Sequence, residues 1–188
     1  MNKPEDFDGV KAYGDYTSLP AGGYYCKIIK VEETQSSTMK PMLKIYIDIV
    51  DGEYKDYYAE SYKSDTRDPK KWGCIVYQLI YDNEGKTSRG FKTFITSVEE
   101  SNNVSMQWGD KFESFLKNKL IGGLFRREEY MKQDGTPAWS TKCFAFRSIS
   151  SIENGVPIPE DKPLAQTATG SYSFKAAIPA FNESDLPF

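Results

Sequence analysis

Apolar and polar side chains alternate most regularly between residues 42 and 62. Every second position from 43 to 49 is leucine or isoleucine, and lysine, tyrosine and aspartate stand between them. This period of two gives a strand one apolar face and one solvent-facing face. Asp51 and Gly52 then supply the residue types of a tight turn. We therefore expect a hairpin. A two-residue turn would place Tyr46 beside Tyr57, whereas a bulge or a longer loop would shift the pairing after Tyr54.

Further elements lie on both sides of this hairpin. Residues 24–33 favour a strand because they are rich in tyrosine, isoleucine and valine. Apolar residues at helical spacing predict a helix over residues 90–102. A short helix is expected at residues 110–115, with Asp110 as its N-cap and Glu113 three residues on. The apolar run at residues 74–81 fits either a strand or a helix.

The second half of the pattern returns to strands. Residues 116–131 predict a strand interrupted by Gly122 and Gly123, a pair that permits sharp curvature or a bulge. Residues 133–137 predict a turn, and residues 139–152 predict another alternating strand. The order of three strands, a helix and two strands is typical of a mainly β, five-stranded antiparallel OB-fold barrel with a helical insertion between strands 3 and 4. A two-sheet sandwich is the alternative.

The two ends of the chain lack this periodicity. Residues 1–20 are polar and predict a loosely ordered arm, so we expect one OB-fold domain over residues 1–158. Residues 159–188 are rich in proline, alanine, serine and threonine and predict a disordered tail. The tail ends in acidic residues before an apolar pair and a terminal carboxylate. Such an end can enter a basic-rimmed pocket of a partner protein. The expected partner-binding residues are Glu183, Asp185, Leu186, Pro187 and Phe188.

Composition narrows the classes of function. The chain has 188 residues, 14% aromatic, and a formal charge of -3. A nucleic-acid binder with this charge must use a local patch and stacking, which argues against duplex binding. The three cysteines are far apart in sequence, the first residues show no apolar run, and no segment approaches the roughly 20 apolar residues that cross a bilayer. We expect a reduced, cytoplasmic protein without a membrane segment.

Aromatic and basic residues on the predicted hairpin and strands are the candidates for binding single strands. An aromatic ring stacks on any base, and nearby cations follow the phosphates. The stacking candidates are Tyr46, Tyr57, Trp72 and Trp139; the basic candidates are Lys44, Lys55, Lys70, Lys71, Arg126, Arg127, Lys132 and Lys142.

Each candidate also has a structural interpretation. Tyrosine is enriched in strands for packing reasons alone. Trp72 and Trp139 can equally close the ends of a barrel. The run from Arg126 to Glu129 can pair with itself on a solvated face.

Enzyme classes find little support. The chain contains no histidine, which removes the commonest general base and metal ligand, and its cysteines lack zinc spacing. Asp48, Asp56, Glu128 and Glu129 remain candidate ligands for Mg²⁺ in a metal-dependent nuclease. We expect no enzyme activity and no cofactor. A protein-interaction or virion component without DNA binding stays an alternative.

Two stretches resemble a known family. The final residues, from Asp185 to Phe188, are similar to the acidic C-terminal tip of bacterial single-stranded DNA-binding proteins, although Glu183 and Ser184 stand where that family has aspartates. Residues 20–155 resemble the longer OB-folds of single-stranded DNA-binding proteins encoded by bacteriophages, through LKIYIDIVDGEYKDYY, GFKTFITSVEESN and GGLFRREEYMKQDG. The resemblance implies cooperative or oligomeric coating of single strands in the bacterial host cytoplasm during replication or recombination. It also implies recruitment of replication or recombination enzymes through the tip.

Overall fold

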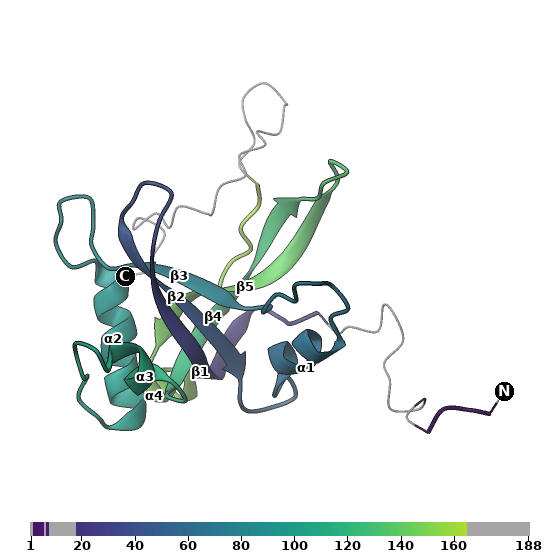
Figure 1. The fold of residues 1–188 in the computed structure, drawn as a ribbon, viewed down its shortest axis with the longest axis horizontal. Coiled ribbons are helices and arrows are strands. Elements are labelled where there is room, and N and C mark those ends of the chain that lie inside the picture. Colours follow the sequence, from purple (N-terminus) through teal and green to yellow (C-terminus); the bar gives the residue numbers. More distant parts are fainter. Residues whose placement is uncertain (1, 6, 8–17, 165–188) are drawn as a thin grey trace.

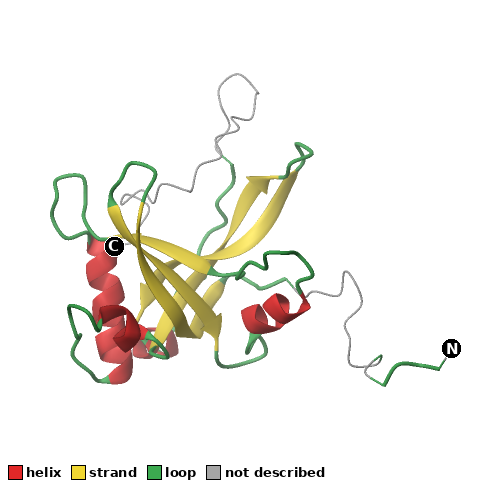
Figure 2. Ribbon diagram, viewed as in Figure 1, coloured by secondary structure: helices red, strands yellow, loops and turns green. Residues whose placement is uncertain are grey.

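Five antiparallel strands in one sheet form the centre of the computed structural model, which describes residues 2–5, 7 and 18–164 (Figure 1, Figure 2). The strand order is β3-β2-β1-β4-β5, so β3 and β5 lie at the two edges. The predicted mainly β architecture, with a helix between the third and fourth strands, is confirmed. The strands are β1 (Gly22–Gln35), β2 (Pro41–Ile49), β3 (Ile75–Leu79), β4 (Leu120–Met131) and β5 (Pro137–Arg147); the helices are α1 (Tyr57–Ser64), α2 (Arg89–Asn102), α3 (Phe112–Leu116) and α4 (Ile149–Glu153).

The aliphatic row of β2 forms the middle of the core. Leu43, Ile45, Ile47 and Ile49 are fully buried, as their alternation predicted. Each contributes about 1.5–3 kcal/mol relative to an exposed side chain. Helix α2, also confirmed, packs on β4 and β5 and buries Phe94 against this core.

The predicted hairpin after β2 is wrong. The chain turns at Gly52 and enters helix α1 instead of a second strand, and the third strand is β3, which lies in the segment that fitted either a strand or a helix. The reason lies in Asp48, whose carboxylate accepts hydrogen bonds from the backbone N–H groups of Tyr58 (2.9 Å) and Ala59 (3.0 Å). A helix N-terminus needs such acceptors, and a strand residue supplies them here. Asp48 is therefore buried, although the alternation predicted it on the solvent-facing side.

Other boundaries also differ from the sequence pattern, since β4 begins at Leu120 and Leu116 lies in α3. Helix α3 begins at Phe112 with Lys111 at its N-cap, so Asp110 is not the cap. Glu113 instead accepts a hydrogen bond from the backbone N–H of Glu33 at 2.7 Å, which ties α3 to β1. Strand β5 ends at Arg147, and the residues after it form helix α4, so the predicted strand over residues 139–152 was too long at that end.

The glycine pair of β4 marks a place without room for side chains. A Cβ on Gly122 would lie 2.5 Å from Ile152 and 2.9 Å from the carbonyl oxygen of Arg147. A Cβ on Gly123 would lie 2.7 Å from the Phe125 ring. The pairing of β4 with β5 shifts immediately afterwards, between Leu124 and Phe125. The pair therefore lets α4 and the core approach opposite faces of one strand.

The hairpin of β4 and β5 extends beyond the rest of the sheet (Figure 1). The chain after α4 contacts β4 again. There the backbone N–H of Lys162 donates to the carbonyl oxygen of Arg127 (2.8 Å), and its carbonyl oxygen accepts from the N–H of Glu129 (2.9 Å). The described chain ends beside β4, where the Leu164 N–H donates to the Glu129 carboxylate. Among the helices of the described ranges, none has the length and apolar character needed to cross a membrane.

Candidate nucleic-acid interface

The side of β1, β2 and β3 that faces away from the core carries an aromatic and charged cluster, which we call the outer-face cluster. Its members are Lys30, Glu32, Lys44, Tyr46 and Tyr77. They are neighbours across the sheet, because Lys30 pairs with Tyr46, Glu32 with Lys44, and Lys44 with Tyr77. The residues between them along each strand are buried in the core. Two predicted residues, Lys44 and Tyr46, therefore belong to one surface.

Glu32 is the electrostatic centre of the outer-face cluster. Its carboxylate accepts a hydrogen bond from the Tyr46 hydroxyl at 2.7 Å, pairs with the Lys44 ammonium at 3.6 Å, and bonds to the Lys30 ammonium. The hydrogen bonds from Lys30 and then Tyr46 lower the pKa of Glu32 to about 2. The hydrogen bond with Glu32 raises the pKa of Lys30, and a hydrogen bond with Tyr46 raises the pKa of Lys44. All three groups stay charged at neutral pH.

Two cations lie close to the Tyr46 ring. The ammonium nitrogens of Lys30 and Lys44 lie 5.9 and 5.0 Å from its centroid. Two ammonium groups and one carboxylate give these residues a charge of +1. An aromatic face with cations beside it is the chemistry that accepts a base and its phosphates.

Sequence reasoning missed three members of this cluster. Lys30 and Glu32 stood in a strand whose pairing partners were unknown. Tyr77 stood in the run that fitted strand or helix equally, and only the strand assignment of β3 places it beside Lys44. Its aromatic type in an alternating apolar run was the available signal.

Lys55 and Tyr57 are not part of this surface, because the hairpin that placed them there does not form. Tyr57 is the first residue of α1, and its ring lies 6.2 Å from Tyr54 and 5.1 Å from Tyr58. Lys55 is exposed in the turn before α1. The pairing of Tyr46 with Tyr57 that a two-residue turn would give does not occur, because residues 57–64 form helix α1.

Trp72 is fixed by the sheet. Its indole N–H donates to the carbonyl oxygen of Ile47 at 2.9 Å, and its ring lies 5.5 Å from that of Tyr62. The Lys70 ammonium lies 5.7 Å from the Tyr62 ring and donates to carbonyl groups at the end of α1. Lys71 is exposed beside them. This geometry favours the structural interpretation of Trp72.

The basic residues of the β4–β5 hairpin are largely paired. The Arg126 guanidinium lies 2.9 Å from Glu128 and 4.4 Å from the Phe144 ring, and Lys142 lies 3.7 Å from the same carboxylate of Glu128. The predicted self-pairing of this run therefore occurs between Arg126 and Glu128. Lys132 lies exposed in the turn.

The opposite face of the hairpin holds Trp139. Its ring is 40% exposed and lies 5.0 Å from the guanidinium of Arg127, which also pairs with Asp161 at 3.3 Å. The structure thus brings Arg127 and Trp139 together, on a separate surface from the outer-face cluster. An incoming phosphate must compete with Asp161 for Arg127.

The four carboxylates considered for a metal do not gather. Asp48 uses its oxygens on backbone N–H groups, and Glu128 pairs with Arg126 and Lys142. Within residues 18–164 and the described part of the arm, no group of three or more histidine, cysteine or acidic residues could hold a metal ion.

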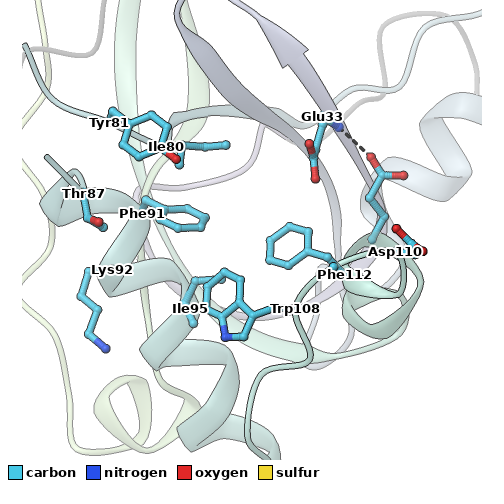
Figure 3. A pocket seen from close by; sticks show the side chains of 12 residues that line it. Glu33, Ile80, Tyr81, Thr87, Phe91, Lys92, Ile95, Trp108, Asp110 and Phe112 are labelled. Atoms are coloured by element: carbon cyan, nitrogen blue, oxygen red, sulfur yellow. Dashed lines mark hydrogen bonds between the residues drawn. The ribbon is translucent and has the colours of Figure 1, made fainter. Parts of the chain in front are cut away.

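A groove with a volume of about 700 Å³ lies between β1, α2 and α3 (Figure 3). Phe91 and Phe112 are buried beneath it, and Trp108 and Tyr81 stand beside it with 63% and 45% of their surface exposed. Trp108 stacks on Phe112 at 5.6 Å and lies 6.3 Å from Phe91. Sequence analysis missed Trp108, which stands in a stretch without periodicity.

Neither the comparison with protein-family models nor that with curated proteins finds a match to this chain. The predicted partner-binding tip, from Glu183 to Phe188, and most of the arm lie outside the described residues.

Proposed function

We propose that this protein binds single-stranded DNA without sequence preference, through the outer face of β1, β2 and β3. The observation that carries the proposal is the Tyr46 ring with the ammonium groups of Lys30 and Lys44 at 5.9 and 5.0 Å from its centroid, and with Tyr77 paired to Lys44 across the sheet. Stacking on such rings contributes about 1–3 kcal/mol per base and needs no base identity. In duplex DNA the bases are stacked on one another and do not stack on tyrosine rings. A duplex therefore gains only the ionic contacts between its phosphates and the lysines.

We also infer that the sheet belongs to an OB-type barrel. The edge strands β3 and β5 support this, since their Cα atoms come within 8 Å of each other. The order of strands around the helix supports it as well. OB-folds bind single strands on the face of the second and third strands. Lys44 and Tyr46 on β2 and Tyr77 on β3 lie on the corresponding strands of this chain, which supports the proposal.

The biological setting that we propose rests on the resemblance to single-stranded DNA-binding proteins of bacteriophages. The protein coats exposed single strands during phage DNA replication or recombination in the bacterial host cytoplasm, without enzyme activity. The tip from Glu183 to Phe188 recruits replication or recombination enzymes. Coating by several copies accounts for protection of a long strand.

The test is an anisotropy titration of fluorescein-labelled oligo-dT and of a matched duplex, at low and moderate salt. The expected result is preference for the single strand, with affinity falling as salt rises. The double variant Tyr46→Ala/Tyr77→Ala should weaken binding tenfold or more, whereas Tyr130→Ala, which removes an exposed tyrosine of the hairpin tip, should change it little. Equal binding to duplex, or no effect of the double variant, would overturn the proposal.

A further inference from the structure

The groove between β1, α2 and α3 has the chemistry of a peptide-binding site and not of a nucleic-acid site. Its base is aromatic and aliphatic, from Phe91, Ile95 and Phe112. Glu33 and Asp110 lie along one side, and Lys92 stands apart from them (Figure 3). Glu113, which also lines the groove, accepts a hydrogen bond from the backbone N–H of Glu33. Three carboxylates and one ammonium give the lining a charge of -2. Phosphates are repelled there, whereas an apolar segment with a positive charge is attracted.

Trp108 is more exposed than Tyr81, the other exposed aromatic residue of the groove. A tryptophan with 63% of its surface exposed contributes little to the core, although its ring stacks on Phe112. Together with Tyr81 it makes an exposed aromatic rim above a buried aromatic floor. Exposed tryptophan and tyrosine beside an apolar groove are typical of surfaces that bind proteins.

We propose that residues 172–181 of this chain occupy the groove. This segment, YSFKAAIPAF, contains Tyr172, Phe174, Ile178 and Phe181, and Lys175 is its only charge. Its apolar residues match the floor, and Lys175 matches the carboxylates along the groove. Residues 183–188 are a poorer match, because the carboxylates of Glu183 and Asp185 meet the same negative rim.

The length of the chain allows the contact. The described residues end at Leu164, and the eight residues from there to Tyr172 span at most about 27 Å. A domain of this size has a radius of gyration of about 15 Å, so the segment reaches well across its own domain or onto a neighbouring copy. Occupation of the groove by residues 172–181 leaves the acidic tip, which begins two residues after Phe181 at Glu183, outside it.

Photo-cross-linking of the full chain tests this inference without any nucleic acid. p-Benzoylphenylalanine replaces Trp108, and the same residue replaces Tyr62 in a control, since Tyr62 is 38% exposed on α1, away from the groove. Mass spectrometry then maps the attachment sites. We expect position 108, and not position 62, to attach to residues 172–181. The mass of the product distinguishes a bond within one molecule from a bond between two copies, and both results support the proposal.

Substitutions then separate specific docking from chance contact. Phe174→Ser with Ile178→Ser should lower the cross-linking yield at least fivefold. Lys175→Asp and Asp110→Lys should each lower it, and the two together should restore it. Attachment to the final six residues, attachment elsewhere, or equal yields from positions 108 and 62 would overturn the proposal. None of these outcomes affects DNA binding by the outer-face cluster.

Discussion

Replacing Glu32 by glutamine removes the one carboxylate that holds both cations of the outer-face cluster. In the wild-type protein this carboxylate pairs with Lys30 and with Lys44, and it accepts a hydrogen bond from the Tyr46 hydroxyl. A phosphate that binds either lysine must compete with it. Glu32→Gln keeps the side-chain shape and an oxygen acceptor, so both ammonium groups become available while the tyrosine keeps its hydrogen bond. We therefore expect tighter binding to single-stranded DNA.

The gain follows from counterion release. Each phosphate contact on a single strand adds about 0.7 to the slope of log K against log salt. In 0.1 M salt one such contact strengthens binding about fivefold relative to 1 M, so two lysines give at most about 25-fold. We expect Glu32→Gln to bind 5–25-fold more tightly in about 0.1 M salt, with the slope steeper by about 0.7–1.4.

The assay is an oligo-dT anisotropy titration at four salt concentrations. The matched control is Glu84→Gln, which makes the same charge change at another exposed lysine pair, with Lys86 at 2.7 Å, outside the cluster. Glu84→Gln should leave the slope unchanged. Equal effects of the two variants, or no gain from Glu32→Gln, would show that Glu32 does not compete with phosphate for Lys30 and Lys44.

Three predictions concern the fold. Asp48→Ala should lower the free energy of unfolding by roughly 2–3 kcal/mol, because buried N–H groups of α1 lose their acceptor, and Asp48→Asn should lower it less. Trp72→Phe should lower it by about 1 kcal/mol through loss of the bond to Ile47, with DNA affinity unchanged. Gly122→Ala should lower it by about 1–3 kcal/mol, because its Cβ meets the backbone carbonyl of Arg147. Urea unfolding measures all three; unchanged midpoints, or a loss of DNA affinity in folded Trp72→Phe, would contradict them.

The pH dependence of stability provides a further check on Glu32. Because the folded pKa is lowered from 4.5 to about 2, the ionised carboxylate stabilises the folded state above pH 4.5. That contribution disappears as the pH falls toward 2. The difference in melting temperature between wild type and Glu32→Gln should therefore shrink between pH 5 and pH 2. A constant difference across this range would show that Glu32 is not held by its partners.

The sequence revealed the elements whose burial is periodic. The alternation of β2 and the helical spacing of α2 both come from a single buried face, so neighbouring residues along the chain contain the whole signal. The turn after β2 was different. Asp51 and Gly52 fit a hairpin locally, but the outcome depends on Asp48 meeting N–H groups ten and eleven residues later.

Less of the candidate interface could be predicted. Lys44 and Tyr46 were found because the polar face of β2 is visible in its alternation. Lys30 and Tyr77 required the pairing of β1 and β3 with β2, which no local pattern gives. Trp108 lies between helices, where only packing on Phe112 reveals its place.

The most direct test of single-strand binding by the outer face is to map where the nucleic acid lies. Oligo-dT containing 5-iododeoxyuridine is cross-linked to the full-length protein under long-wavelength light, and the attached peptides are identified by mass spectrometry. We expect attachment at Tyr46 or Tyr77, and we expect it to be lost when salt dissociates the complex. Attachment confined to Trp139 or Trp108, or no complex with the single strand, would contradict it.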